Sequence, residues 1–150
     1  MTKDVLISIK GLQFEGSQDD RHEQVELIVS GSYYKKNGVH YLIYNEQLEG
    51  MPEPTRNMIR ISTDRVEMSK QGGFAVSMNF IEGQKNMSSY RTPFGNMMVS
   101  VDTSAIHIKE TEDSLALEIL YQLDMNYEFF AECRVELLAC SKEAGAMMFI

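Results

Sequence analysis

The chain has 150 residues and a formal net charge of −8 at pH 7. This length suffices for one domain with a sizeable hydrophobic core, and we expect a single domain over residues 1–150. The acidic balance, without clustered Lys and Arg, argues against nucleic acid as a partner, because binding of phosphates needs such clusters. Apolar runs stay far below the roughly 18 residues that a membrane span requires, so we expect no membrane span.

We expect neither an export signal nor a disulfide in this sequence. Residues 1–11 hold a short apolar run without a small-residue cleavage site, so we do not interpret them as a secretory signal. If Cys133 and Cys140 lie in one extended strand, they are about 23 Å apart, which is too far for a disulfide. We therefore expect two free thiols and a reducing, cytoplasmic location.

Alternating apolar and polar residues predict β-strands from the start of the chain. Val5, Ile7 and Ile9 form the first alternating set, and a second set runs through residues 25–33. Asn37-Gly38 follows, which is the residue pair that favours a tight type I′ turn. The sequence therefore predicts a β-hairpin within residues 32–50.

Tyrosines line both arms of this predicted hairpin. The alternation assigns Tyr33 and Tyr41 to one set, and Tyr34 and Tyr44 to the other. We expect one of these pairs to face the core and the other pair to face outward. The apolar set that starts at residue 25 favours Tyr33 and Tyr41 as the inward pair, in which case the hairpin mainly closes the core. An inward position of Tyr34 and Tyr44 would instead supply hydroxyl groups to a pocket.

Turn signals then recur every 8 to 12 residues or so. Pro52 and Pro54 predict a loop at a sheet edge, because proline cannot donate a hydrogen bond to a strand ladder. The spacing between turns is too short for crossover helices and indicates an all-β sandwich or barrel. Residues 113–141 leave two readings open, since they contain strong helix formers but also alternate without a break. We expect two long strands there.

Four motifs resemble a known family. They are GSYYKKNG at residues 31–38, YLIY at 41–44, MNFIEG at 78–83 and YRTPFG at 90–95. In this order and spacing they resemble the DUF1934 family of small bacterial proteins, also called the YwiB-like family, over nearly the whole chain. The resemblance implies an all-β fold, namely an antiparallel up-and-down β-barrel of about 8–10 strands that is calycin-like or lipocalin-like. It implies no established biochemical role.

The C-terminal tail, residues 141–150, departs from that family pattern. It ends in AGAMMFI in place of a short charged terminus. Exposed apolar residues would promote aggregation, so we expect the tail to pack against the barrel or against a second subunit.

Methionines and aromatic residues suggest a binding function for the barrel. The chain has 11 Met, 7 Tyr and 7 Phe, which can form an adaptable apolar lining, although ordinary core packing explains the same composition. An inward arginine flanked by tyrosines would hold a carboxylate, as in a fatty-acid-like ligand. The alternative places the arginines on the outer face, paired with acids. The candidate ligand-binding residues are Tyr34, Tyr44, Arg60, Met78, Tyr90 and Arg91.

No catalytic, metal-binding or cofactor-binding motif stands out. The sequence lacks the His and Cys spacings of metal sites and a Gly-rich phosphate loop, and we expect neither a metal nor a cofactor. His40 is expected at the surface, and its use as a base in an esterase or isomerase is the least favoured hypothesis. The sequence favours non-catalytic binding of a small, largely apolar and possibly anionic ligand. The alternative is an interaction module or homodimer that uses a barrel edge or the C-terminal tail.

Overall fold

The computed structural model describes residues 3–11, 26–47, 52–72, 75–92 and 95–143. In these residues, ten antiparallel strands form one continuous sheet. The strands are β1 (Lys3–Lys10), β2 (Glu26–Lys36), β3 (Val39–Glu46), β4 (Thr55–Ile61), β5 (Arg65–Gln71), β6 (Val76–Ile81), β7 (Lys85–Thr92), β8 (Gly95–Glu110), β9 (Ser114–Met125) and β10 (Glu128–Ser141).

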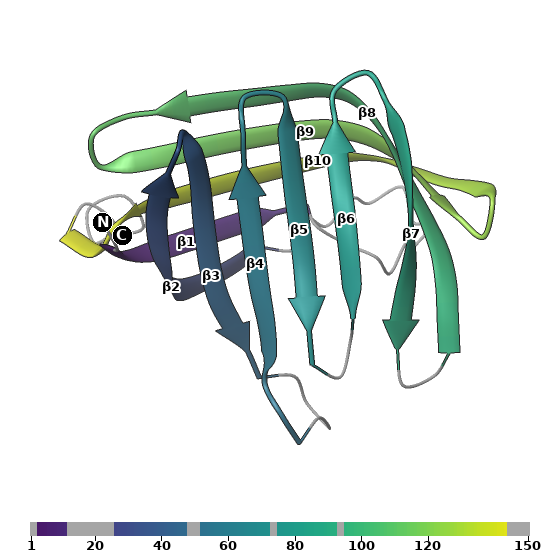
Figure 1. The fold of residues 1–150 in the computed structure, drawn as a ribbon, viewed down its shortest axis with the longest axis horizontal. Helices are drawn as coiled ribbons and strands as arrows, with labels where there is room; N and C mark the ends of the chain where they lie inside the picture. Colours follow the sequence, from purple (N-terminus) through teal and green to yellow (C-terminus); the bar gives the residue numbers. More distant parts are fainter. Residues whose placement is uncertain (1–2, 12–25, 48–51, 73–74, 93–94, 144–150) are drawn as a thin grey trace.

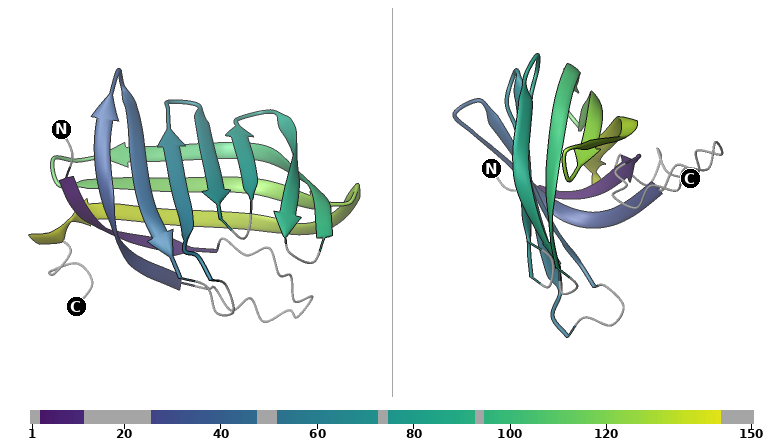
Figure 2. Two further views of the ribbon diagram at one scale, coloured as in Figure 1. Left: turned by 60° about the horizontal axis from the view of Figure 1, so that its bottom comes forward. Right: turned by 90° about the vertical axis from the view of Figure 1, so that its right-hand side faces the viewer.

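The sheet curls into a nearly closed barrel. Its strand order is β6-β5-β4-β3-β2-β1-β10-β9-β8-β7, so β6 and β7 are the two edges, and a bridge between Ala75 and Arg91 brings these edges together. In Figures 1 and 2, β3–β7 form one wall, and β8, β9, β10 and β1 cross behind it. The prediction of an all-β, antiparallel, up-and-down barrel of about 8–10 strands is confirmed.

Strand β2 passes from one wall to the other. Its first part pairs with β1 and its last part pairs with β3, and the two ladders overlap at residues 32–33. Gly31 lies at this change of partner, where an added Cβ would come within 2.7 Å of both the carbonyl oxygen of Ile43 and Cδ1 of Ile7. The strand can therefore bend closely over its neighbours because this residue has no side chain.

Strand β8 makes the corresponding passage on the other side of the barrel. It pairs with β7 through residues 95–102 and with β9 through residues 99–110, so the two ladders overlap. A register shift between Thr103 and Ala105 marks a β-bulge, which bends a strand and increases its local twist. The bulge lets one strand contribute to both walls.

The predicted turn at Asn37-Gly38 is confirmed. Asn37 has a φ of 52° and Gly38 a φ of 78°, as the two central residues of a type I′ turn require, and Lys36 pairs with Val39. The two-residue loop sets the register of the whole hairpin.

The predicted division of the tyrosines is wrong. Tyr33 lies opposite Leu42 and Tyr34 lies opposite Tyr41, because a two-residue turn pairs each odd-numbered residue of β2 with an even-numbered residue of β3. Tyr33 and the buried Tyr44 therefore face the interior. Tyr34 and Tyr41 stack on the outer face with ring centroids 4.5 Å apart. The inward residues are therefore odd-numbered on β2 and even-numbered on β3, so an alternating pattern cannot be continued by residue number across a two-residue turn.

The region 113–141 forms two strands, as expected. β9 and β10 pair from Met125 and Glu128 back to Ser114 and Cys140. Burial alternates along both strands, with Leu117, Ile119 and other odd-numbered residues facing the core. Both cysteines are free, and Cys140 is buried.

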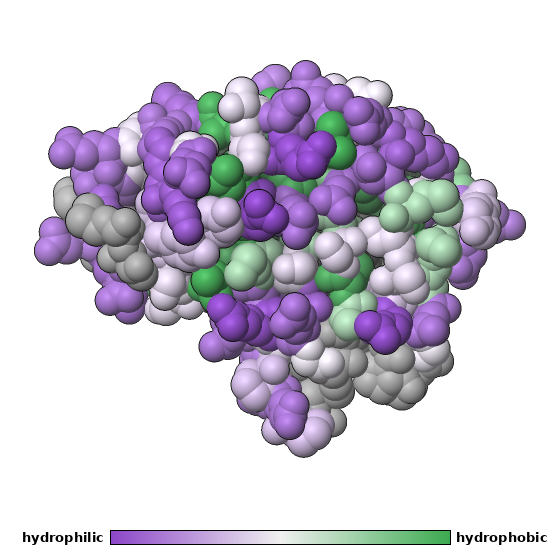
Figure 3. Space-filling view, viewed as in Figure 1, coloured by the Kyte–Doolittle hydropathy of each residue, from purple (hydrophilic) through white to green (hydrophobic). Residues whose placement is uncertain are grey.

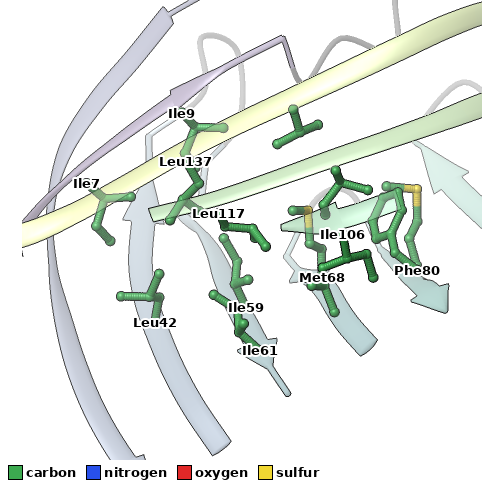
Figure 4. Close-up of a cluster of buried hydrophobic side chains, with 14 of the residues drawn as sticks. Ile7, Ile9, Leu42, Ile59, Ile61, Met68, Phe80, Ile106, Leu117 and Leu137 are labelled. Atoms are coloured by element: carbon green, nitrogen blue, oxygen red, sulfur yellow. The ribbon is translucent and has the colours of Figure 1, made fainter. Parts of the chain in front are cut away.

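Apolar side chains from both walls fill the interior. Figure 4 shows residues of β1, β3, β4, β5 and β6 meeting residues of β8, β9 and β10. Fully buried members of this core include Ile7, Leu42, Ile61, Phe80, Ile119 and Leu123. The barrel interior is a packed core that stabilises the fold by burial of apolar surface.

One prediction involves residues outside the described part of the chain. The C-terminal tail is described up to residue 143, so the expected packing of residues 144–150 stays a prediction. Within the described residues, no helix has the length and apolar character needed to cross a membrane.

Candidate functional site

The structure divides the six candidate ligand-binding residues between the two faces of the barrel wall. Tyr44, Met78 and the partly buried Tyr90 pack with the core. The other three residues, Tyr34, Arg60 and Arg91, lie on strand positions that face outward. The six residues therefore do not surround one space.

The inward group has little room for a ligand. The hollow beside Tyr44 and Met78 measures about 10 Å³, which is near the minimum for a single water molecule. Tyr44 is 4% exposed, and burial raises the pKa of its hydroxyl, with a smaller contribution from Glu46. A fatty acid at this place would require the core to rearrange.

The outward arginines line an open groove of about 840 Å³ over β4, β5, β6 and β7. Figure 3 shows this outer wall, where hydrophilic side chains surround less polar patches. The groove contains the side chains of Arg56, Met58, Arg60, Glu67, Ser69, Ser77, Ser89 and Arg91, among others. Arg60 and Arg91 thus share a groove, but on the outside of the barrel.

The strand register arranges these residues in rows across the wall. Arg56 lies opposite Gln71, and Ala75 lies opposite Arg91. In the next row, Met58 lies opposite Ser69, and Ser69 lies opposite Ser77. The third row begins with Arg60 opposite Glu67. Residues on one face repeat every second position, so adjacent rows are about 7 Å apart along the strands.

One of the three arginines has a partner on the protein. The Arg60 guanidinium lies 3.8 Å from the Glu67 carboxylate and 5.5 Å from the centre of the Tyr41 ring. Its contact with Tyr41 is a cation–π interaction. The expected pairing of the arginines with acids is therefore found at this residue.

Arg56 and Arg91 differ, since neither forms an ion pair or a side-chain hydrogen bond with any residue that the structure describes. Both are exposed. Arg134, on the opposite wall, shows the contrast, because its Nε donates to Glu118 at 2.8 Å and lies 3.0 Å from Glu136. Two guanidinium groups of the groove are therefore available to an anionic ligand.

Comparisons with known proteins show the family to which this barrel is related. A family model described as "Domain of unknown function (DUF1934)" matches residues 7–137. The chain belongs to the DUF1934 family. The prediction from the four motifs is confirmed.

A curated relative of this DUF1934 protein is the "Uncharacterized beta-barrel protein YwiB" of Bacillus subtilis (strain 168). It is 23% identical over 110 residues, which cover 73% of this chain and 76% of the relative. The crystal structure of the ywiB protein from Bacillus subtilis matches with a TM-score of 0.76 and 20% identity, covering 93% of this chain and 92% of that chain. At this identity the structural match shows a shared β-barrel fold. None of these descriptions names a reaction or a ligand.

One end of the DUF1934 barrel holds a second polar cluster. The Tyr33 hydroxyl lies 2.8 Å from Nδ1 of His40, and Nε2 of His40 lies 3.8 Å from the Glu110 carboxylate. Lys35 donates to both oxygens of Glu110 at 3.2 and 3.3 Å. A hollow of about 90 Å³ adjoins Tyr33 and Glu110. The cluster links the β2–β3 hairpin to the end of β8 on the other wall.

His40 is buried, and the prediction of a surface histidine is wrong. It is 7% exposed because its strand position faces the interior, two residues before the core residue Leu42. Burial lowers its pKa, Glu110 opposes that change, and Lys35 adds to it. Tyr33 is no activated nucleophile, because burial and Glu110 raise the pKa of its hydroxyl.

The thiols and acids of the described residues form no catalytic or metal site that we recognise. Burial raises the pKa of both Cys133 and Cys140, so the unreactive thiol form dominates. Within the described ranges, no group of three or more His, Cys, Asp or Glu residues is arranged to hold a metal ion.

The sequence reasoning omitted Ser69, Ser77 and Ser89 from the candidate site of this DUF1934 protein. These residues come from β5, β6 and β7, and only the register of these strands brings them to one groove. The alternation along each strand could have shown that these residues face outward. It does not show which residues of different strands lie side by side.

Proposed function

We propose that this protein is a non-catalytic binding protein whose ligand is small, anionic and partly apolar, and that the ligand lies in the groove over β4–β7. The observation that carries the proposal is the pair of unpaired guanidinium groups, Arg56 and Arg91, at opposite sides of one groove. The proposed site therefore lies on the outer wall and not in the barrel interior, where the sequence suggested it.

The charge of the groove supports an anionic ligand. Among the described residues, its lining contains Arg56, Arg60, Arg91 and Lys70 but only one carboxylate, that of Glu67, in a chain whose formal net charge is −8. Lys70 is held elsewhere, because its Nζ donates to Glu46 at 3.1 Å. Two arginines thus offer planar forks of N–H donors, which suit carboxylate and phosphate groups.

The floor of the groove supports a partly apolar ligand. The half-buried side chains of Met58 and Ala75 contribute to its lining between the arginines. A methionine side chain adapts to ligands of different shapes. The Met and arginine side chains together match an anion that carries a small hydrocarbon part.

Anion titrations test the proposal. We expect aromatic and aliphatic carboxylates and phosphates to raise the melting temperature at low salt and to shift amide resonances of β4–β7 in NMR spectra. The double substitution Arg56→Gln and Arg91→Gln should reduce the affinity by roughly tenfold or more, since it removes two charge-assisted contacts. Arg134→Gln is the matched control, because Arg134 is already paired on the opposite wall. Amide resonance shifts that are spread over all walls of the barrel, or equal losses of affinity in the two variants, would contradict binding in the groove.

An interaction module is the second candidate, and one surface feature favours it. At the end of the β9–β10 hairpin, Tyr127 in the turn is 76% exposed and Phe129 at the start of β10 is 62% exposed. Aromatic side chains exposed at a hairpin end are typical anchors of protein contacts. If this surface forms a homodimer, Phe129→Ser should lower the mass measured by light scattering from dimer to monomer, and an unchanged mass would exclude the surface as the dimer contact.

A further inference from the structure

The groove crosses the place where the two edges of the sheet meet. β6 and β7 are consecutive strands, and their turn is closed by a hydrogen bond from the Gln84 amide to the Ile81 carbonyl at 2.9 Å. At the far end, Ala75 and Arg91 exchange two backbone hydrogen bonds, of 3.0 and 2.8 Å. Between these points the described residues of β6 and β7 form no ladder. We call this unpaired stretch the seam.

Serine hydroxyls border the seam on the outer face. Ser77 lies on β6 and Ser89 lies on β7, each two positions from the Ala75–Arg91 bridge, so they face each other across the seam. Ser69 continues the same row on β5. Ser77 and Ser89 are exposed, and neither hydroxyl bonds to another side chain among the described residues. The hydroxyl groups of this row are therefore available to donate hydrogen bonds to a ligand.

Arg91 completes this set of donors. It follows Ser89 by two positions on the same face of β7, so its guanidinium starts about 7 Å along the strand from the Ser89 side chain. Arg56 lies in the same row as Arg91, three strands away, at about 14 Å. One cation is thus adjacent to the serines, and a second lies at the far side of the groove.

This arrangement favours a tetrahedral anion over a planar one. A carboxylate has two oxygens in one plane, which a single arginine satisfies. A phosphate monoester has three terminal oxygens that point in different directions, and it carries close to two negative charges at pH 7. Two hydroxyls on opposite sides of the seam and one guanidinium match three such oxygens.

We propose that the groove binds a phosphate monoester, with its phosphate group held across the seam by Ser77, Ser89 and Arg91. The organic part extends over β5 and β4 past Met58 toward Arg56 and Arg60. This inference rests on the proposed function, because it names the ligand class of the same groove. The bound phosphate would bridge the two edges of the sheet where the backbone leaves them unpaired.

Two matched probes, phenyl phosphate and benzoate, test the inference by calorimetry at low salt on the full chain. We expect phenyl phosphate to bind roughly tenfold more tightly than benzoate. The double substitution Ser77→Ala and Ser89→Ala should abolish most of that difference and leave benzoate binding unchanged. Ser30→Ala, an exposed serine of β2, is the control and should change neither affinity. Because all three serines lie at surface positions, these variants should fold, which unchanged circular dichroism and melting curves verify.

The possible outcomes separate the two proposals. If both probes bind through Arg91 with equal affinity, or if the serine variants bind phenyl phosphate normally, the phosphate assignment is wrong while the binding function stands. If inorganic phosphate binds as tightly as phenyl phosphate, the groove takes the free ion and the monoester assignment is wrong. If neither probe binds, both the proposed function and its ligand class are overturned.

Discussion

The hydroxyl of Tyr33 lies 2.8 Å from Nδ1 of His40, and this contact ties two neighbouring strands together at one end of the barrel. Their rings are 5.9 Å apart and nearly parallel, at 26°. Nε2 of His40 reaches toward Glu110, at 3.8 Å, on the opposite wall. His40 is therefore a buried, polar link between the two walls of a barrel whose interior is otherwise mostly apolar.

We predict that this link makes stability depend on pH. The pKa of His40 in the folded protein lies below the value near 6.5 of an exposed histidine, mainly because burial disfavours the charged imidazole. The unfolded chain therefore takes up the proton more readily, so the free energy of unfolding should fall as the pH drops below about 6.5. Urea denaturation at pH 7.5, 6.5 and 5.5 measures this decrease.

Two substitutions isolate the contribution of His40. His40→Gln should lower stability at pH 7.5, because it removes the contact with Tyr33, and should flatten the dependence on pH. His107→Gln is the control, because His107 is 67% exposed and does not belong to the cluster of Tyr33, His40 and Glu110. An identical slope in the wild type and in His40→Gln would assign the pH dependence to other groups.

We predict that Phe80 is a main determinant of core stability. Its side chain is 0% exposed and meets the Tyr121 ring edge-on, with centroids 4.9 Å apart. Phe80→Ala should lower the free energy of unfolding by about 3–5 kcal/mol, because it removes buried apolar surface and leaves a cavity. Phe129→Ala removes the same atoms from an exposed side chain and should cost less than about 1 kcal/mol. Similar losses in the two variants, measured by urea denaturation, would show that the core is less tightly packed than described.

We predict that Gly31 tolerates no larger residue. A Cβ at this position would lie 2.7 Å from the Ile43 carbonyl oxygen, a backbone atom that cannot move without disturbing β3. Gly31→Ala should therefore destabilise the protein by about 1–3 kcal/mol through overpacking. Ser30→Ala on the same strand should be nearly neutral, since Ser30 is exposed. A thermal melt of the two variants that shows equal midpoints would contradict the close approach of β2 and β3.

Strand alternation made most of this fold predictable, because the inward residues of each strand are strongly apolar. Ile7, Leu117 and Val135 are examples, and each is nearly inaccessible to solvent. Asn37-Gly38 likewise predicted its turn, since both residues accept a positive φ. Both predictions succeed because strand alternation and turn formation depend on residues that are neighbours in the sequence.

The candidate site was less predictable, because it depends on how strands are arranged relative to each other. Arg56 and Arg91 are 35 positions apart in sequence but share a row, which follows from the registers of β4, β5 and β6 and from the Ala75 bridge. The inward position of His40 depended on the same kind of information. Its parity relative to Tyr33 was set by the length of the turn between them.

We predict opposite effects for two tyrosine hydroxyls that face the barrel interior. The Tyr121 hydroxyl is buried with no oxygen or nitrogen hydrogen-bond partner among the described residues. Burial raises its pKa, and the neighbouring Cys133, whose thiol is only a weak hydrogen-bond partner, raises it further. An unpaired buried hydroxyl costs about 1–3 kcal/mol. Tyr121→Phe should therefore leave stability unchanged or raise it, because the ring that packs on Phe80 remains.

The matched variant is Tyr33→Phe, which deletes a hydroxyl that His40 does bind. It should lower the free energy of unfolding by about 1 kcal/mol, the typical net worth of one hydrogen bond. Urea denaturation at pH 7.5, where His40 is neutral, compares the two. If Tyr121→Phe destabilises the barrel as much as Tyr33→Phe does, the Tyr121 hydroxyl has a partner in solution, and a buried water molecule is the simplest one. Tyr121 lies opposite Thr103, whose hydroxyl is also buried without a partner in the part of the chain that the structure describes, so this pair is the place to look for the water.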